Sequence, residues 1–139
     1  MVPEFELCEL SHVASLHRQI AQFGLPYGGN VHVDLVMGVP GGMPGTADAL
    51  VAAVNALPEA VTSWSATGIG RSTLAVALAS LSKGGHLRVG MEDVLTLAKG
   101  VPVEHNEQLV SRAVELGRLA QRVPTTPAEA RDLLQIKRR

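Results

Sequence analysis

The feature that most constrains the fold is a regular alternation of short apolar runs with longer segments of helical periodicity. The apolar runs cover residues 5–10, 31–37, 62–67 and 86–91. Each is followed, after a loop, by a segment in which apolar residues recur every three or four positions. This alternation predicts parallel strands joined by right-handed helical crossovers. We therefore expect residues 1–139 to form one α/β domain.

The helical segments have recognisable starts. We expect the first to begin at Ser11, the second at Thr46 and the third near Ser72. Two more are expected, over residues 106–122 and from Thr126, where Thr-Pro-Ala-Glu is a capping box with proline at the first helical position. Residues 92–104 favour a short helix. Four such units fit either a small open sheet or half of a barrel of about eight strands.

Composition excludes several classes of protein. Apolar residues make up 46% of the chain and charged residues 18%, which is typical of a globular protein. The formal net charge is −1, and the only basic run is Lys137, Arg138 and Arg139, so no nucleic-acid partner is expected. With one cysteine and no long apolar run or leader, we expect a cytoplasmic protein without a membrane segment.

The fourth apolar run carries polar residues at alternate positions. Side chains alternate between the two faces of a strand, so His86, Arg88, Gly90 and Glu92 are expected on the face away from the helices. Gly90 would leave room for Arg88 to reach the carboxyl end of the strand, where barrel enzymes carry out their chemistry. The alternative is a structural ion pair between Arg88 and a carboxylate.

Glu92 and Asp93 come at the end of this run, a position suited to a metal ligand or a catalytic base. One carboxylate does not make a zinc site, which normally takes three protein ligands, commonly including histidine. The histidines are scattered and form no His-x-His pair; they are His12, His17, His32, His86 and His105.

Two glycine-rich segments follow other runs. Gly68, Gly70 and Arg71 lie between a strand and a helix, an arrangement that can bind phosphate or can be only a tight turn. Residues 38–45 form either an active-site loop or a flexible connector.

Together these motifs resemble those of the β-keto acid cleavage enzymes, of the 3-keto-5-aminohexanoate cleavage enzyme type. The likeness rests on Gly-Val-Pro-Gly-Gly at 38–42, Trp-Ser at 64–65, Gly-Ile-Gly-Arg at 68–71 and above all Arg-Val-Gly-Met-Glu-Asp at 88–93. Leu-Ala-Lys-Gly at 97–100 and Thr-Pro-Ala-Glu-Ala-Arg at 126–131 extend it. The motifs occur in order over nearly the whole chain.

The resemblance implies a zinc-dependent (β/α)8 barrel that converts a β-keto acid and acetyl-CoA into acetoacetate and a new acyl-CoA. It implies that Glu92 is a zinc ligand, that Asp93 is the catalytic base and that Arg88 is the electrostatic partner of Asp93. Gly68, Gly70 and Arg71 would then be candidates for contact with a phosphate of coenzyme A.

The sequence departs from the family pattern in two respects. Val94 stands where an asparagine commonly follows the Glu-Asp pair. The family's zinc-binding His-x-His pair and most contacts to the substrate carboxylate belong to an N-terminal half that this chain lacks. The likeness therefore implies half of a TIM barrel, with the four runs as strands five to eight plus a C-terminal helix.

Three hypotheses follow from the sequence. In the first, a complementary N-terminal half-barrel completes an enzyme with this chain. In the second, the chain is a catalytically inactive half-barrel that self-associates to cover its exposed strand edges. In the third, it is a small open-sheet module that binds a phosphate or nucleotide.

Overall fold

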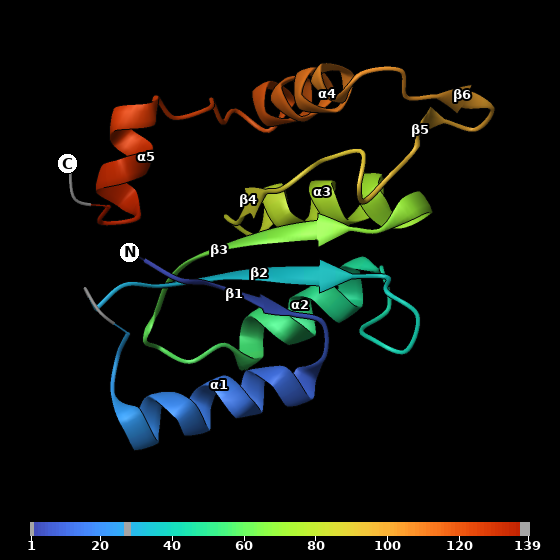
Figure 1. Ribbon diagram of the computed structural model, residues 1–139. Coiled ribbons are helices and arrows are strands. Elements are labelled where there is room, and N and C mark those ends of the chain that lie inside the picture. The colour runs from blue at the N-terminus through green and yellow to red at the C-terminus, as the bar shows by residue number, and fades with distance from the viewer. Residues whose placement is uncertain (1, 27–28, 137–139) are drawn as a thin grey trace.

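The computed structural model describes residues 2–26 and 29–136, and it contains a parallel four-stranded sheet (Figure 1). The basic residues 137–139 lie outside this part. The strands are β1 (Glu4–Leu7), β2 (Val31–Met37), β3 (Val61–Gly68) and β4 (His86–Leu87), side by side in that order. Each neighbouring pair is parallel. The predicted α/β organisation with alternating strands and helices is confirmed.

The helices follow one another along the sheet. They are α1 (Leu10–Phe23), α2 (Ala47–Ala56), α3 (Thr73–Ser82), α4 (Asn106–Leu119) and α5 (Pro127–Leu133), with a 3₁₀ turn, η1 (Gly70–Ser72), before α3. In Figure 1, α1 and α2 lie beneath β1 and β2, while α3 lies beside β3 with α4 beyond it. Each helix from α1 to α4 contacts the next. No helix in the described ranges is both long and apolar enough for a bilayer crossing.

One face of the sheet packs against these helices and forms the main core. Val31, Val33, Leu35 and Met37 alternate along β2, and all four are fully buried. They pack with Leu50 of α2 and with residues of α1 and α3. Because side chains alternate along a strand, the remaining residues of each strand face the opposite side. This opposite side carries the polar residues described below.

Four predicted helix starts are confirmed, at Thr46, Ser72, Asn106 and Thr126, whereas the first helix is capped two residues before the predicted Ser11. Thr46 caps α2 by accepting a hydrogen bond from the Ala49 amide, and Thr126 forms the capping box of α5. Helix α1 begins at Leu10, with Glu9 as its cap, and Ser11 already lies inside it. The His12 ring accepts a hydrogen bond from the Cys8 amide, which lies just before the first turn of this helix.

The segment that follows β4 differs from expectation. The predicted strand over residues 86–91 is a strand only at His86–Leu87, the two residues that pair with β3. The predicted short helix is instead a hairpin of β5 (Thr96–Ala98) and β6 (Val101–Pro102). Gly100, with φ of 78°, supplies the left-handed residue that the turn between them needs.

Candidate active site on the polar face of the sheet

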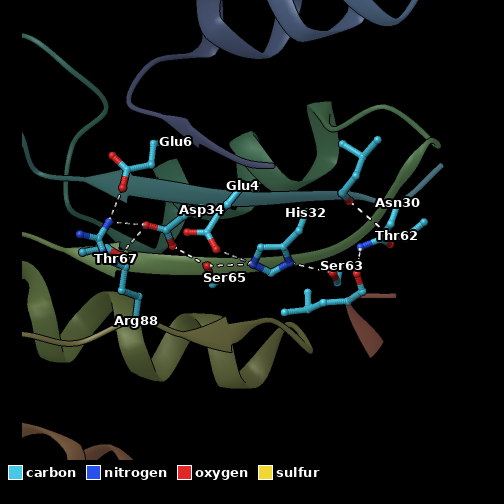
Figure 2. Close-up of polar contacts among 12 residues, drawn as sticks. Glu4, Glu6, Asn30, His32, Asp34, Thr62, Ser63, Ser65, Thr67 and Arg88 are labelled. Atoms are coloured by element: carbon cyan, nitrogen blue, oxygen red, sulfur yellow. Dashed lines mark hydrogen bonds and ion pairs between the residues drawn. The ribbon is translucent and has the colours of Figure 1, made fainter. Parts of the chain in front are cut away.

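The side of the sheet opposite the core carries a continuous set of polar side chains, here called the polar face. It comprises Glu4 and Glu6 from β1, His32 and Asp34 from β2, Ser63, Ser65 and Thr67 from β3, and His86 and Arg88 at β4. The parallel register aligns Glu6, Asp34, Ser65 and His86 across the four strands. Figure 2 shows these side chains, apart from His86, reaching toward one another over the sheet.

Asp34 is the centre of the hydrogen bonding on the polar face. Its side chain is fully buried. The hydroxyls of Ser65 and Thr67 each donate to it at 2.6 Å, and the Arg88 Nη1 lies 3.4 Å from its Oδ2 (Figure 2). A buried carboxylate is costly unless its oxygens are satisfied, and here both of them have donors. Asp34 therefore ties β2, β3 and the end of β4 together through polar contacts.

Arg88 joins carboxylates that lie far apart in the sequence. Its Nη1 donates to Glu6 at 2.6 Å and also approaches Asp34, while its Nη2 donates to Glu92. Burial lowers the pKa of Arg88, but the Glu92 hydrogen bond and the charges of Asp93, Glu6 and Asp34 outweigh it and raise that pKa above its ordinary value. The guanidinium stays charged, and three carboxylates fix its position.

Asp93 lies beside this set with an unsatisfied oxygen. Its Oδ2 is buried and has no hydrogen-bond partner among the described residues. Burial raises the pKa of Asp93; Arg88 lowers it, and the charges of Glu92, Asp34 and Glu6 raise it further. A carboxylate with a raised pKa and a free oxygen is a better proton acceptor than an ordinary aspartate. Such an unpartnered buried atom needs an explanation, and a catalytic role is one that fits its position here.

The backbone of Asp93 is fixed by the glycine turn that follows β3. The Gly70 amide donates to the Asp93 carbonyl at 2.7 Å, and the Asp93 amide donates to the Gly90 carbonyl at 3.0 Å. A Cβ at Gly90 would lie nearest Asp93 and Asn106. The space beside this glycine therefore faces Asp93, whereas the strand pattern predicted that it would accommodate Arg88. Two segments far apart in sequence thus hold Asp93 at the carboxyl end of the sheet.

The glycines of the turn at residues 68–71 have a structural role. A Cβ on Gly68 would approach the Ser72 carbonyl oxygen and the Thr73 Cα to 2.7 Å, so only glycine fits there. The amides of Ile69, Gly70 and Ser72 all donate to carbonyls within the chain. These amides have no free proton for a phosphate, which leaves the exposed Arg71 as the group of this turn that can reach an anion.

The glycine-rich loop at residues 38–45 is anchored across the carboxyl ends of β1 and β2. The Met43 amide donates to the Cys8 carbonyl, and the Gly38 amide donates to the Met43 carbonyl. A Cβ on Gly42 would lie 2.6 Å from the Cys8 carbonyl oxygen. The loop is therefore held in place at the same end of the sheet as Asp93, which argues against a flexible connector, while its active-site role stays a prediction.

A second group of polar residues lies near the amino ends of the strands. The His32 Nδ1 is 2.7 Å from the Ser63 hydroxyl, and its Nε2 is 3.6 Å from Glu4. The His86 ring lies 6.4 Å from the His32 ring, centroid to centroid. Burial lowers the pKa of His32, against the charges of Glu4 and Asp34. Burial, with Arg122 and His32, also lowers the pKa of His86.

The described residues include no cluster of three histidine, cysteine, aspartate or glutamate side chains that could hold a metal ion. Glu92 has an accessible carboxylate, with 68% of its side chain exposed, at the end of the segment after β4. Its carboxylate has the chemistry of one metal ligand, the role that the family resemblance implies and that stays a prediction, and a complete site would need further donors.

The sequence pattern correctly brought Arg88 together with Glu92, but it missed two other partners of Arg88. Glu6 and Asp34 were not expected at the site. The signal was present, because Asp34 is the one acidic residue in the apolar run at 31–37. An acid in a strand buried on both faces indicates a partner of opposite charge.

Comparison with known proteins agrees with the family resemblance that the sequence motifs indicate. A family model described as beta-keto acid cleavage enzyme matches residues 1–136. The 3-keto-5-aminohexanoate cleavage enzyme of Acetoanaerobium sticklandii is 37% identical over 108 residues, which cover 78% of this chain and 39% of that protein.

Two longer matches come from other members. The 3-dehydrocarnitine:acetyl-CoA trimethylamine transferase of Rhizobium meliloti is 35% identical over 137 residues, covering 99% of this chain and 44% of that protein. The 3-oxoadipate:acetyl-CoA acetyltransferase of Cupriavidus necator is 36% identical over 138 residues, covering 95% of this chain and 46% of that protein. The chain thus spans less than half the length of these relatives.

Proposed function

Because the chain belongs to the β-keto acid cleavage enzyme family, we propose that it supplies one half of an active site that cleaves a β-keto acid with acetyl-CoA as co-substrate. The products are acetoacetate and a new acyl-CoA. Two relatives whose names specify acetyl-CoA as a reactant support the choice of co-substrate. The names of the relatives specify different substrates, so the proposal does not specify the side chain of the β-keto acid.

The observation that carries the proposal is the buried, unpartnered Oδ2 of Asp93 beside the Arg88–Glu92 pair. In the proposed reaction Asp93 is the base that takes a proton from the substrate, a role that its raised pKa favours. Arg88 lies close enough to lower the pKa of Asp93, so its guanidinium is also placed to stabilise negative charge that develops on the substrate. Glu6 and Asp34 orient that guanidinium.

In the proposed site, Glu92 is the one zinc ligand that the described residues supply. The carboxylate of Glu92 would be one ligand, and the remaining ligands would come from outside the described residues. A bound zinc ion would supply polarisation of the substrate's keto oxygen. Val94, in place of the family's usual asparagine, removes one polar group from the neighbourhood of this ligand.

The rest of the site would be completed by another half of the barrel. The four parallel strands would correspond to strands five to eight of a (β/α)8 barrel, with residues 1–139 as a single half-barrel domain. A barrel of this kind places its chemistry at the carboxyl ends of the strands, where Arg88, Glu92 and Asp93 lie. The partner is a complementary N-terminal half-barrel or a second copy of this chain.

Coenzyme A would approach the same end of the sheet. Because the amides of Ile69, Gly70 and Ser72 already donate within the chain, we expect the exposed Arg71 guanidinium to make the contact with a phosphate of coenzyme A. Gly68 and Gly70 would shape the turn that presents Arg71 and would not bind the phosphate themselves. An Arg71→Ala substitution should therefore raise the KM for acetyl-CoA more than it lowers kcat.

The test is an assay of acyl-CoA formation by the chain mixed with the N-terminal half of the Acetoanaerobium sticklandii relative. The mixture should form a one-to-one complex that binds zinc and cleaves 3-keto-5-aminohexanoate, while either half alone should be inactive. Asp93→Asn should lower kcat at least about 100-fold, the usual contribution of a general base. Asp132→Asn, which changes an exposed aspartate in α5, is the matched control and should leave kcat unchanged.

Two results would contradict the proposal. One is a zinc-loaded one-to-one complex without turnover. The other is an Asp93→Asn complex that is as active as the unsubstituted one, because this would show that another group takes the proton.

A further inference from the structure

The turn at residues 90–94, here called the 90–94 turn, carries both Glu92 and Asp93. Its internal hydrogen bonds fix its shape, because the amides of Asp93 and Val94 both donate to the Gly90 carbonyl, at 3.0 and 3.2 Å. Bonds within a turn do not set where the turn lies relative to the rest of the protein. The position of the Asp93 carboxylate therefore depends on the contacts that this turn makes with other segments.

Within the described chain, two hydrogen bonds join the backbone of the 90–94 turn to distant segments. The Gly70 amide donates to the Asp93 carbonyl at 2.7 Å. The Met91 amide donates to the side-chain Oδ1 of Asn106 at 3.0 Å, and Asn106 is the first residue of α4. The first bond joins two backbone groups, so a change of side chain does not remove it. The second bond depends on the side chain of Asn106, and a substitution there removes it.

The orientation of the Asn106 carboxamide follows from this contact. Because a backbone amide can only donate, the atom that faces Met91 is the carbonyl oxygen of the carboxamide. A Cβ at Gly90 would lie 3.7 Å from Oδ2 of Asp93 and 3.8 Å from Oδ1 of Asn106, so the two oxygens border the same space. Asn106 thus anchors the turn without a hydrogen bond to Oδ2 of Asp93. Such a bond would lower the pKa of Asp93.

The 90–94 turn and α4 also share a small apolar core. Leu109 of α4 and Val94 of the turn are buried in it, and Met91 packs against them. Apolar contact brings the two segments together but sets no direction, whereas a hydrogen bond has a preferred geometry. The bond from the Met91 amide to Asn106 is therefore the contact that orients the turn on α4.

We propose that Asn106 is a positioning residue for the proposed reaction, because it holds the 90–94 turn so that Oδ2 of Asp93 stays buried and unpartnered. Asn106 acts through the Met91 amide and does not touch the reacting atoms. The catalytic meaning of this contact rests on the proposed function, whereas the contact itself is a property of the folded chain. Without it the Met91 amide lacks an acceptor, and the turn is free to bring the Asp93 carboxylate into water.

The first test compares two variants of Asn106 in the folded chain alone. Asn106→Ala removes the acceptor, so the Met91 amide should exchange with solvent at least about 10-fold faster. The pKa of Asp93, measured by carbon-13 NMR, should fall toward its ordinary value because the carboxylate becomes hydrated. Asn106→Asp keeps an acceptor oxygen, so the Met91 amide should stay protected. Its added negative charge should instead raise the pKa of Asp93 further.

The matched control is Gln108→Ala, in the same turn of α4. The Gln108 side chain accepts hydrogen bonds from the amides of the two residues that precede Asn106, at 2.8 and 3.1 Å. Its loss weakens the start of α4, but it should leave the Met91 exchange rate and the pKa of Asp93 unchanged. A shift of that pKa as large as the one in Asn106→Ala would overturn the proposal, because helix stability would then explain both. Circular dichroism of all variants checks that they fold.

The second test uses the complex with a relative's N-terminal half. Asn106→Ala should lower kcat about 10-fold and leave the KM for acetyl-CoA unchanged, because a misplaced base slows the chemical step. Asn106→Asp should retain more of kcat than Asn106→Ala. An Asn106→Ala chain whose Met91 exchange rate or Asp93 pKa is unchanged overturns the proposal, as does one with full kcat in an active complex. A complex without turnover, in which Asn106→Ala still shifts the pKa of Asp93, would contradict the proposed function and support the anchoring role of Asn106.

Discussion

The two faces of strand β2 are equally buried and chemically opposite. Leu35 on the helix-covered face and Asp34 on the polar face are each fully buried, although they are neighbours in the sequence. Leu35 is surrounded by aliphatic side chains, whereas Asp34 accepts hydrogen bonds from Ser65, Thr67 and Arg88. The helix-covered face supplies stability. Burial of charged groups carries a desolvation cost, and apolar residues in place of a buried ion pair are often neutral for stability. The retention of charged residues on the polar face therefore favours a functional role for them.

The largest effect on stability should come from the helix-covered face. Leu35→Ala removes a fully buried side chain, and it should lower the free energy of unfolding by about 3 kcal/mol in urea denaturation. Leu95→Ala is the control, because Leu95 is exposed and its loss should change the free energy by less than about 0.5 kcal/mol. Equal effects at the two positions would mean that this face is not the core.

A smaller loss is expected from the polar face. Asp34→Ala leaves the Ser65 and Thr67 hydroxyls and one contact of Arg88 without an acceptor, so it should lower the free energy of unfolding by about 2 kcal/mol. Thr67→Val removes only one of these hydrogen bonds and should cost about 1 kcal/mol. If Asp34→Ala were neutral, the carboxylate would not organise the polar face.

A substitution of Asp93, unlike one of Asp34, should raise the free energy of unfolding. Asp93→Asn replaces a buried carboxylate oxygen without a partner by a neutral amide, which should raise the free energy of unfolding by about 1 kcal/mol. Asp132→Asn, at an exposed position, should have no measurable effect. A destabilised Asp93→Asn chain would show that the aspartate is held for structure and not for chemistry.

The smallest expected effect is the change of stability with pH that His32 causes. The pKa of His32 is lowered by burial, so the unfolded chain binds more protons than the folded one below about pH 6.5. Stability should therefore fall as the pH drops from about 6.5 toward 5, and His32→Gln should reduce this slope. His86, whose pKa is lowered in the same direction, accounts for part of the remaining slope. Thermal unfolding across this pH range measures both, and stability that rises on acidification would contradict the assignment.

The sequence was sufficient for the parts of the fold that depend on local chemistry. Alternating apolar patterns predicted the four strands, and the Thr46 and Thr126 caps predicted two helix starts, because each signal lies within a few residues. The extent of the fourth strand was wrong because only His86 and Leu87 pair with β3, and this pairing depends on the tertiary structure and not on the apolar run itself. The hairpin of β5 and β6 was missed because Val94, Leu95, Leu97 and Ala98 have a spacing that also suits a helix.

The site was predictable to a similar degree. Alternation along residues 86–91 placed Arg88 with Glu92, which the structure confirms. The contributions of Glu6 and Asp34 depend on the order and register of the strands, which no pattern within a single run contains. The attachment of Asp93 to the Gly70 amide joins two loops and needed the tertiary structure in the same way.

The most direct test of the central claim is a carbon-13 NMR titration of the Asp93 carboxyl group in the folded chain, assigned by its absence in Asp93→Asn. An aspartate held buried and unpartnered as a base should titrate with a pKa above the ordinary value of about 3.9. Arg88→Gln should raise that pKa further, because it removes the nearest positive charge. An Asp93 pKa at or below the ordinary value, unchanged by Arg88→Gln, would contradict the account.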